Sequence, residues 1–328
     1  MRAIFKWGIA ATCILVAGSI LFNSIDIETQ ANSKKVVANT KTKSQSISLN
    51  QLPEQASQKQ SNLLTSAFNL PSYCRQKLLF VGTGSQSVSQ ADEFRALFEQ
   101  DTRLNSLPIC IYEATWLAQD DLSCDPDWQQ SGRLGCQLLP LAEKIKSIAF
   151  THLVVFADKG KANVHNGIMF LDVDDSYDVF IHELAHFSGF IDEYPLSQSL
   201  AKRVCAGVDA PNMVFQQNAD LPADQQYWQS LGLRKADIHV ARTCDNHTAQ
   251  AFKASNKLTF MEYHDTAYIP AHYLAAWQQQ LQNTPNQPSA HINFSQLYEH
   301  VNNTSESQFW LVKYQQYLKN HPPITSRL

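Results

Sequence analysis

Residues 182 to 194 read His-Glu-Leu-Ala-His-Phe-Ser-Gly-Phe-Ile-Asp-Glu-Tyr, and this stretch decides how the rest of the chain is interpreted. On a helix, the side chains of His182 and His186 project from one face, one turn apart. Two imidazole nitrogens in that position can bind one zinc ion at about 2.0 Å. Glu183, next to the first histidine, supplies a carboxylate that can take a proton from a water molecule on the metal. The stretch therefore predicts a helix that carries a hydrolytic zinc site.

The residues after the second histidine supply candidates for a third ligand. Gly189 can end the helix in a left-handed turn, and three residues later Asp192 offers a carboxylate oxygen. A catalytic zinc site has three protein ligands and one open position, so the chain must return to the metal after the helix. Asp192 has the better spacing, and the adjacent Glu193 is the second candidate. A solvated turn is the alternative explanation for both carboxylates.

These residues resemble the signature of the metzincin metallopeptidases, His-Glu-x-x-His-x-x-Gly-x-x-His. The positions in register with it are His182, Glu183, His186 and Gly189. Asp192 stands at the place of the last histidine, which is similar to the snapalysin-type branch. The Asp-Glu-Tyr ending also resembles the IgA-cleaving metallopeptidases, with a spacing one residue shorter. The resemblance implies that His182, His186 and Asp192 bind Zn²⁺.

The resemblance covers residues 77–283 and implies an α+β fold. A mixed sheet would pack against the active-site helix, with an irregular lower subdomain below it and a helical extension outside the resemblance. Met261, followed by Tyr263, looks like the Met-x-Tyr turn that lies beneath the metal in several metzincins. By the same resemblance Tyr263 would approach the metal or the oxyanion as a catalytic residue, and ordinary core packing is the alternative for both side chains. A strand near 164–171 would be the edge strand to which an extended peptide adds by main-chain hydrogen bonds.

Hydrophobic periodicity predicts the elements around the motif. Expected strands are 77–82, 108–116, 151–157 and 163–171, and expected helices are 91–104, 138–150, 176–188, 197–204, 222–231 and 271–282, with two more within 293–318. The region from 195 to 256 otherwise looks irregular. The acidic run 172–175 precedes the motif helix. Its simplest explanation is that Asp174, Asp175 or Ser176 caps the helix, and a calcium site is the alternative.

The N-terminus carries an export pattern. Arg2 and Lys6 precede an apolar run from Trp7 to Phe22, which is typical of an export signal and short for a membrane-spanning helix. A cleaved signal and an uncleaved membrane anchor both remain open. Residues 23–70 are rich in Ser, Gln, Asn, Lys and Thr and predict a disordered linker. The expected domains are 1–22 as signal or anchor, 23–70 as linker, 71–283 as metallopeptidase domain and 284–328 as helical extension.

Six cysteines remain when Cys13, which lies inside the apolar run, is set aside. An even number of cysteines in an exported chain predicts three disulfides, whose pairing the spacing alone does not determine. The most local pair is Cys124 with Cys136, and the other pairs that we consider are Cys205 with Cys244 and Cys74 with Cys110.

Composition and charge narrow the function further. The net charge is −4 and no run of basic residues interleaved with aromatics occurs, which argues against nucleic acid as a partner. We therefore predict an exported zinc metalloendopeptidase, periplasmic, extracellular or membrane-anchored, that acts on peptides or proteins. The alternative is a cell-envelope binding or scaffold protein with a structural zinc site. Glu183 favours the enzyme, because a structural site needs no general base. The sequence identifies neither the substrate nor the oligomeric state.

Overall fold

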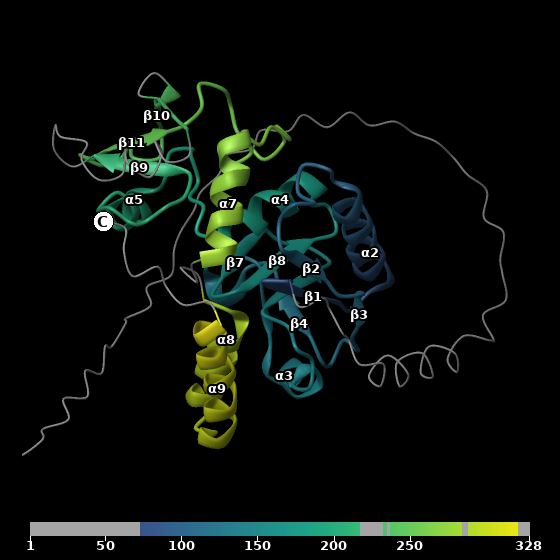
Figure 1. The fold of residues 1–328 in the computed structure, drawn as a ribbon. Helices are drawn as coiled ribbons and strands as arrows, with labels where there is room; N and C mark the ends of the chain where they lie inside the picture. The colour runs from purple at the N-terminus through teal and green to yellow at the C-terminus, as the bar shows by residue number, and fades with distance from the viewer. Residues whose placement is uncertain (1–72, 217–231, 235–236, 284–287, 321–328) are drawn as a thin grey trace, which may run out of the picture.

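The computed structural model of the chain describes residues 73–216, 232–234, 237–283 and 288–320 (Figure 1). A six-stranded sheet lies at its centre, with strand order β2-β1-β6-β8-β7 and β3 also paired to β1. Its strands are β1 (Gln76–Gly82), β2 (Ile109–Ile111), β3 (Thr115–Trp116), β6 (His152–Ala157), β7 (Asn163–His165) and β8 (Ile168–Asp172). All pairs are parallel except β7 with β8, so the sheet is mixed and the fold is of the predicted α+β class. The predictions for residues 1–70 and 222–231 lie outside the described residues.

The central strands are buried on both faces because helices cover both faces. Successive residues of a strand point to opposite sides. Leu78 and Phe80 of β1 therefore belong to one core, and Leu79 and Val81 to the other. The first core contains residues of α2 (Ser85–Gln100), α4 (Tyr177–His186) and α7 (Ala271–Asn283), and the second contains residues of α3 (Leu139–Ile145), α8 (Ala290–His300) and α9 (Thr304–Asn320). The motif helix, α4, thus lies on a rigid scaffold.

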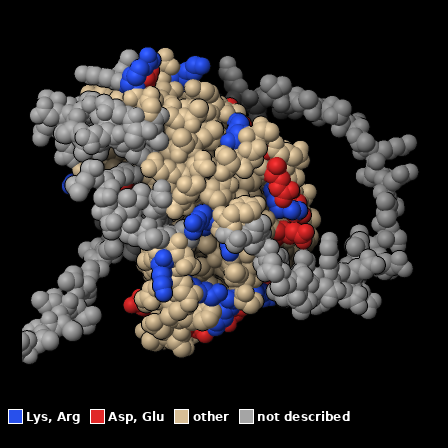
Figure 2. Space-filling model, viewed as in Figure 1, with Lys and Arg blue, Asp and Glu red and all other residues tan. Residues whose placement is uncertain are grey.

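The C-terminal helices, predicted as a pair within 293–318, complete the second core. Phe294 of α8 and Trp310 of α9 are fully buried, and their ring centroids lie 4.6 Å apart. The backbone N–H of Ala290 donates to the carbonyl of Thr151 at 2.9 Å, which ties the start of α8 to the sheet. Figure 2 shows acidic and basic side chains together near α3 and α9, where Lys146 Nζ lies 2.5 Å from Glu306 Oε2.

Truncation of Trp310 to alanine is expected to lower the free energy of unfolding by about 3–5 kcal/mol, because a cavity replaces the indole in the second core. Chemical denaturation of the full-length protein measures this change. Val312→Ala is the matched control on the same helix, since Val312 is 40% exposed, and its effect should stay within about 0.5 kcal/mol. Equal effects of the two substitutions would contradict a core role for α9.

The single strand predicted over 163–171 is wrong, because this segment forms a hairpin. β7 and β8 pair in antiparallel register across Asn166 and Gly167, whose φ angles are 44° and 77°. An Asn-Gly pair is favoured in such two-residue turns because both residues tolerate positive φ. Space also requires Gly167, since a Cβ there would lie 2.3 Å from the backbone nitrogen of Ala290. The edge strand on this side of the sheet is therefore β7 alone.

The region from 195 to 256 is more regular than predicted. It contains the expected helix as α5 (Gln198–Val204) and a three-stranded antiparallel sheet in the order β10 (His239–Ala241), β11 (Gln250–Lys253) and β9 (Met213–Gln216). Strands of three or four residues are too short for a periodic pattern to stand out in the sequence. In Figure 1 this sheet and the α8–α9 pair lie at opposite ends of the molecule.

Three disulfides confirm the predicted pairs: Cys74–Cys110, Cys124–Cys136 and Cys205–Cys244. The second closes a hairpin of β4 (Ser123–Asp125) and β5 (Gly135–Gln137). Disulfides persist in oxidising compartments, so these bonds indicate an exported protein. Within the described ranges, no helix combines the length and the apolar composition needed to cross a membrane.

Candidate metal centre

A serine cap begins helix α4 and sets the register of the motif. Ser176 Oγ accepts a hydrogen bond from the backbone N–H of Val179 at 3.3 Å, so Ser176 is the cap among the three predicted candidates. Asp175 instead accepts from the backbone N–H of Asp172 at 2.8 Å. Burial, together with the nearby carboxylates of Asp172 and Glu183, raises the pKa of Asp175 to about 7. The acidic run thus bonds to its own backbone.

Helix α4 ends where the sequence predicts, and the chain turns back toward the motif. Gly189 has a φ of 83°, the left-handed conformation that favours glycine at a helix end. The backbone N–H of Phe190 donates to the carbonyl of Ala185 at 3.3 Å, which closes the turn. Phe187 and Phe190 are both buried in the first core. Their packing directs the next residues back along α4.

This turn brings Asp192 to the two histidines. Asp192 Oδ1 lies 3.0 Å from His182 Nε2 and 3.3 Å from His186 Nε2. One ligand atom from each of the three residues lies within 4.8 Å of the others, and among the described residues this is the one group of such side chains with metal-binding spacing. Ligand atoms bound tetrahedrally at about 2.0–2.1 Å lie about 3.3–3.4 Å apart. His182, His186 and Asp192 can therefore hold a metal ion.

The other ring nitrogen of each histidine contacts a backbone carbonyl. His182 Nδ1 lies 2.8 Å from the carbonyl oxygen of Phe260, and His186 Nδ1 lies 2.8 Å from that of Phe190. A carbonyl only accepts, so both Nδ1 atoms carry the proton, and in the neutral rings both Nε2 atoms present lone pairs. This arrangement is the usual one for histidines that bind a metal through Nε2.

The three groups act on one another electrostatically. Asp192 Oδ1 is buried and receives no hydrogen bond from the described residues. Burial would lower the pKa of His186, but the Asp192 carboxylate raises it to about 9. Burial would likewise raise the pKa of Asp192, and the two imidazoles instead hold it well below its usual range. The three groups thus favour positive charge among their ligand atoms, and a metal ion would compete with protons for that position.

Tyr194, the last residue of the Asp-Glu-Tyr ending, hydrogen-bonds to the third ligand, a role that the sequence did not predict. Burial, followed by the charge of Asp192 and a hydrogen bond to it, raises the pKa of the Tyr194 hydroxyl far above its usual range. The neutral hydroxyl donates to the Asp192 carboxylate. The hydroxyl of Thr243 donates to the backbone carbonyl of Asp192 at 2.8 Å. Hydrogen bonds to both its backbone and its side chain thus fix the orientation of Asp192, as is usual for metal ligands.

Glu193, the second candidate for the third ligand, has its carboxylate in a separate buried network. Its Oε2 accepts from Thr259 Oγ1 at 2.6 Å, and its Oε1 accepts from Tyr273 Oη at 2.6 Å and from Asn212 Nδ2 at 3.0 Å. Lys253 Nζ lies 3.4 Å from Oε2. Burial raises the pKa of Glu193, although these donors favour its charged form. The structure therefore places Asp192 in the ligand group and Glu193 in a buried network that anchors the same segment.

The turn that contains Met261 lies directly against the ligands. Phe260 supplies the carbonyl that contacts His182 Nδ1, and the carbonyl of Met261 accepts from the backbone N–H of Glu193 at 2.9 Å. Met261 is fully buried in the first core. One short turn thus orients a histidine ligand and the segment that carries the aspartate.

The two predicted catalytic side chains differ in their surroundings. Glu183 is 9% exposed on the helix that carries both histidines. Tyr263 is 52% exposed, its ring stacks on His264 with centroids 5.4 Å apart, and its hydroxyl bonds to Asp265, which raises the pKa of Tyr263. Glu183 thus lies on the ligand helix, where its charge raises the pKa of His186, whereas the Tyr263 hydroxyl bonds to Asp265.

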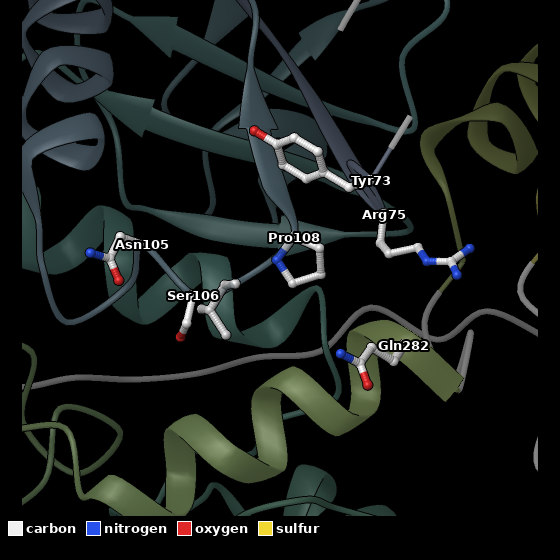
Figure 3. Close-up of a pocket in the computed structure, with 7 residues that line it drawn as sticks. Tyr73, Arg75, Asn105, Ser106, Pro108 and Gln282 are labelled. Atoms are coloured by element: carbon white, nitrogen blue, oxygen red, sulfur yellow. The ribbon is translucent and has the colours of Figure 1, made fainter. Parts of the chain in front are cut away.

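A separate hollow of about 640 Å³ lies at the start of β1 and the end of α7 (Figure 3). Its lining residues are Tyr73, Arg75, Asn105, Ser106, Leu107, Pro108 and Gln282. None of them belongs to the ligand group or to the motif. We therefore assign the candidate metal centre to the two histidines and Asp192, where the donor atoms converge, and not to this hollow.

The comparisons with known proteins found no match: no protein-family model fits the chain, and no curated protein resembles its sequence closely enough to count as a relative. The likeness to the metzincins therefore rests on the motif residues themselves. The geometry of His182, His186 and Asp192 is independent of that likeness, because it follows from the contacts of the side chains.

Proposed function

We propose that the chain is an exported zinc-dependent endopeptidase of the metzincin type that hydrolyses peptide bonds with Glu183 as general base. One observation carries most of the proposal. The buried Oδ1 of Asp192 lies 3.0 and 3.3 Å from two histidine nitrogens whose partner nitrogens hold the ring protons. Two imidazoles and one carboxylate form a donor set of catalytic zinc sites, whereas calcium and magnesium prefer oxygen ligands. His182, His186 and Asp192 would hold the zinc ion.

Glu183 would perform the proton transfers. When bound, zinc polarises the scissile carbonyl and lowers the pKa of a water molecule beside it. Glu183 accepts the proton from this water and delivers it to the leaving amine. Its charge reaches the site, since it raises the pKa of both His186 and Asp175. Tyr194 keeps Asp192 oriented through its hydrogen bond throughout the reaction.

An extended peptide would bind along β7. Among the described strands, β7 is the end strand of the sheet and pairs with β8, and an end strand is the position at which an extended peptide can add by main-chain hydrogen bonds. Helix α4 lies against both β7 and β8. A peptide added to β7 would therefore run beside the helix that carries the histidines, which supports cleavage within a chain.

The full-length protein is expected to bind one zinc ion per chain and to cleave peptides in a mixed library, because the three ligands leave one coordination position open. A chelator should remove both properties, and zinc should restore both. Elemental analysis and mass spectrometry of the library measure them. Bound zinc without any cleavage would support the scaffold alternative, and failure to retain a transition metal would contradict both zinc proposals.

A further inference from the structure

A third histidine lies beside the ligand group. The rings of His264 and His182 have centroids 6.5 Å apart and planes at 84°. The two motif ligands, His182 and His186, have centroids 5.0 Å apart and planes at the same 84°. The ring of His264 therefore has the same interplanar angle to His182 as the ring of His186, at a longer centroid distance.

The contacts of His264 follow the pattern of the two ligands. Its Nδ1 lies 2.7 Å from Asp265 Oδ1, and a carboxylate, like a carbonyl, accepts the proton of that nitrogen. In the neutral ring, Nε2 then presents a lone pair, as it does in His182 and His186. A carboxylate on the other ring nitrogen also increases the basicity of a metal-binding imidazole.

The backbone around His264 is anchored, whereas its side chain is not enclosed. The backbone N–H of Tyr263 donates to the carbonyl of Thr259, and that of Thr266 to the carbonyl of Tyr263, both at 3.0 Å. The side chains of His264 and Asp265 are 46% and 54% exposed. An exposed imidazole on an anchored turn can therefore change its rotamer without moving the main chain.

We propose that His264 is a fourth, exchangeable ligand of the metal, which binds when no substrate is present and leaves when substrate arrives. The inference rests on the proposed function. With one carboxylate and three neutral imidazoles, the resting site would have a closed ligand set around a divalent ion. Because the ring is exposed and its partner Asp265 is exposed too, little buried contact opposes its release. Tyr263 acts here as a positioning residue, since its ring stacks on His264 and its hydroxyl bonds to Asp265.

X-ray absorption of the zinc-loaded full-length protein tests the proposal, because multiple scattering counts the imidazoles on the metal. Three imidazoles are expected in the native protein and two in His264→Ala. His300→Ala removes another exposed histidine, at the end of α8, and should leave three. Acetohydroxamate, a small zinc-binding probe, should lower the count of the native protein from three to two. Two imidazoles without the probe, or three with the probe at saturation, would overturn the proposal.

Zinc affinity gives a second, independent measurement. His264→Ala should weaken zinc binding by about tenfold or more in a chelator competition, while Tyr263→Phe, which keeps the stacked ring, should change it less. Unchanged affinity in His264→Ala would contradict a bond to the metal. A protein that retains no zinc in any form would refute the proposed function itself, whereas zinc held by two imidazoles would refute the role of His264 alone.

Discussion

Replacement of Glu183 by glutamine is expected to lower kcat/KM for peptide hydrolysis by about 10²–10⁴-fold while the zinc content stays at one per chain. Glutamine has nearly the shape of glutamate but does not accept the proton of the attacking water. The metal ligands are other residues, so the metal should remain. Steady-state kinetics and elemental analysis on the same preparation measure the two quantities together.

Glu93→Gln is the matched control for this substitution. Glu93 is an exposed residue of α2, so the same chemical change is made outside the helix that carries the ligands. Its kcat/KM should stay within a factor of two or three of the native value, since most surface changes cost less than about 0.5 kcal/mol. Full activity in Glu183→Gln would show that another group transfers the proton, and a loss of zinc in that variant would show that Glu183 is a ligand.

Asp192→Asn is expected to weaken zinc binding strongly. The loss of affinity should exceed the roughly 10–100-fold effect of removing a side chain that only hydrogen-bonds to a metal ligand. The amide oxygen carries no charge, so the substitution removes the one anionic ligand assigned to the divalent ion. Competition with a chromogenic chelator measures the affinity. Activity should disappear together with the metal at limiting zinc.

Glu193→Gln provides the contrast at the next residue. An amide nitrogen would face donors such as Thr259 and Tyr273, so the buried network would be left unsatisfied at a cost of about 1–3 kcal/mol. The free energy of unfolding should fall, but zinc affinity should weaken by no more than the roughly 10–100-fold expected for a residue that only supports a ligand. If Glu193→Gln lost more affinity than Asp192→Asn, the assignment of the third ligand would be reversed.

The local parts of the site follow directly from the sequence. The i, i+4 histidines and the left-handed Gly189 depend on helix geometry and on one residue's backbone freedom, so a short stretch predicts them. The three disulfides also agree with the pairs considered from the spacing. The Asn166-Gly167 pair is an equally local signal, because Asn-Gly favours a two-residue hairpin turn. The prediction of one strand over 163–171 did not take it into account.

The choice between Asp192 and Glu193 depends on distant residues. Adjacent side chains in an extended segment point in different directions. The exact path of the chain after Gly189 therefore decides which carboxylate faces the histidines. The partners that hold Glu193 away from the metal are 19, 66 and 80 residues further along the chain, at Asn212, Thr259 and Tyr273. No spacing rule anticipates such contacts, and the same holds for Phe260 beneath His182.

The position of α8 and α9 late in the sequence bears on when the chain can complete its fold. Synthesis proceeds from the N-terminus, so β1, β6 and β8 are complete while α8 and α9 are still to come. Until then Val81, Val155 and Phe170 lack the covering that Phe294 and Trp310 provide. A chain with one uncovered sheet face exposes apolar surface, and incompletely folded chains of this kind are prone to aggregate. Removal of α8 and α9 would therefore expose the sheet that supports the ligand helix.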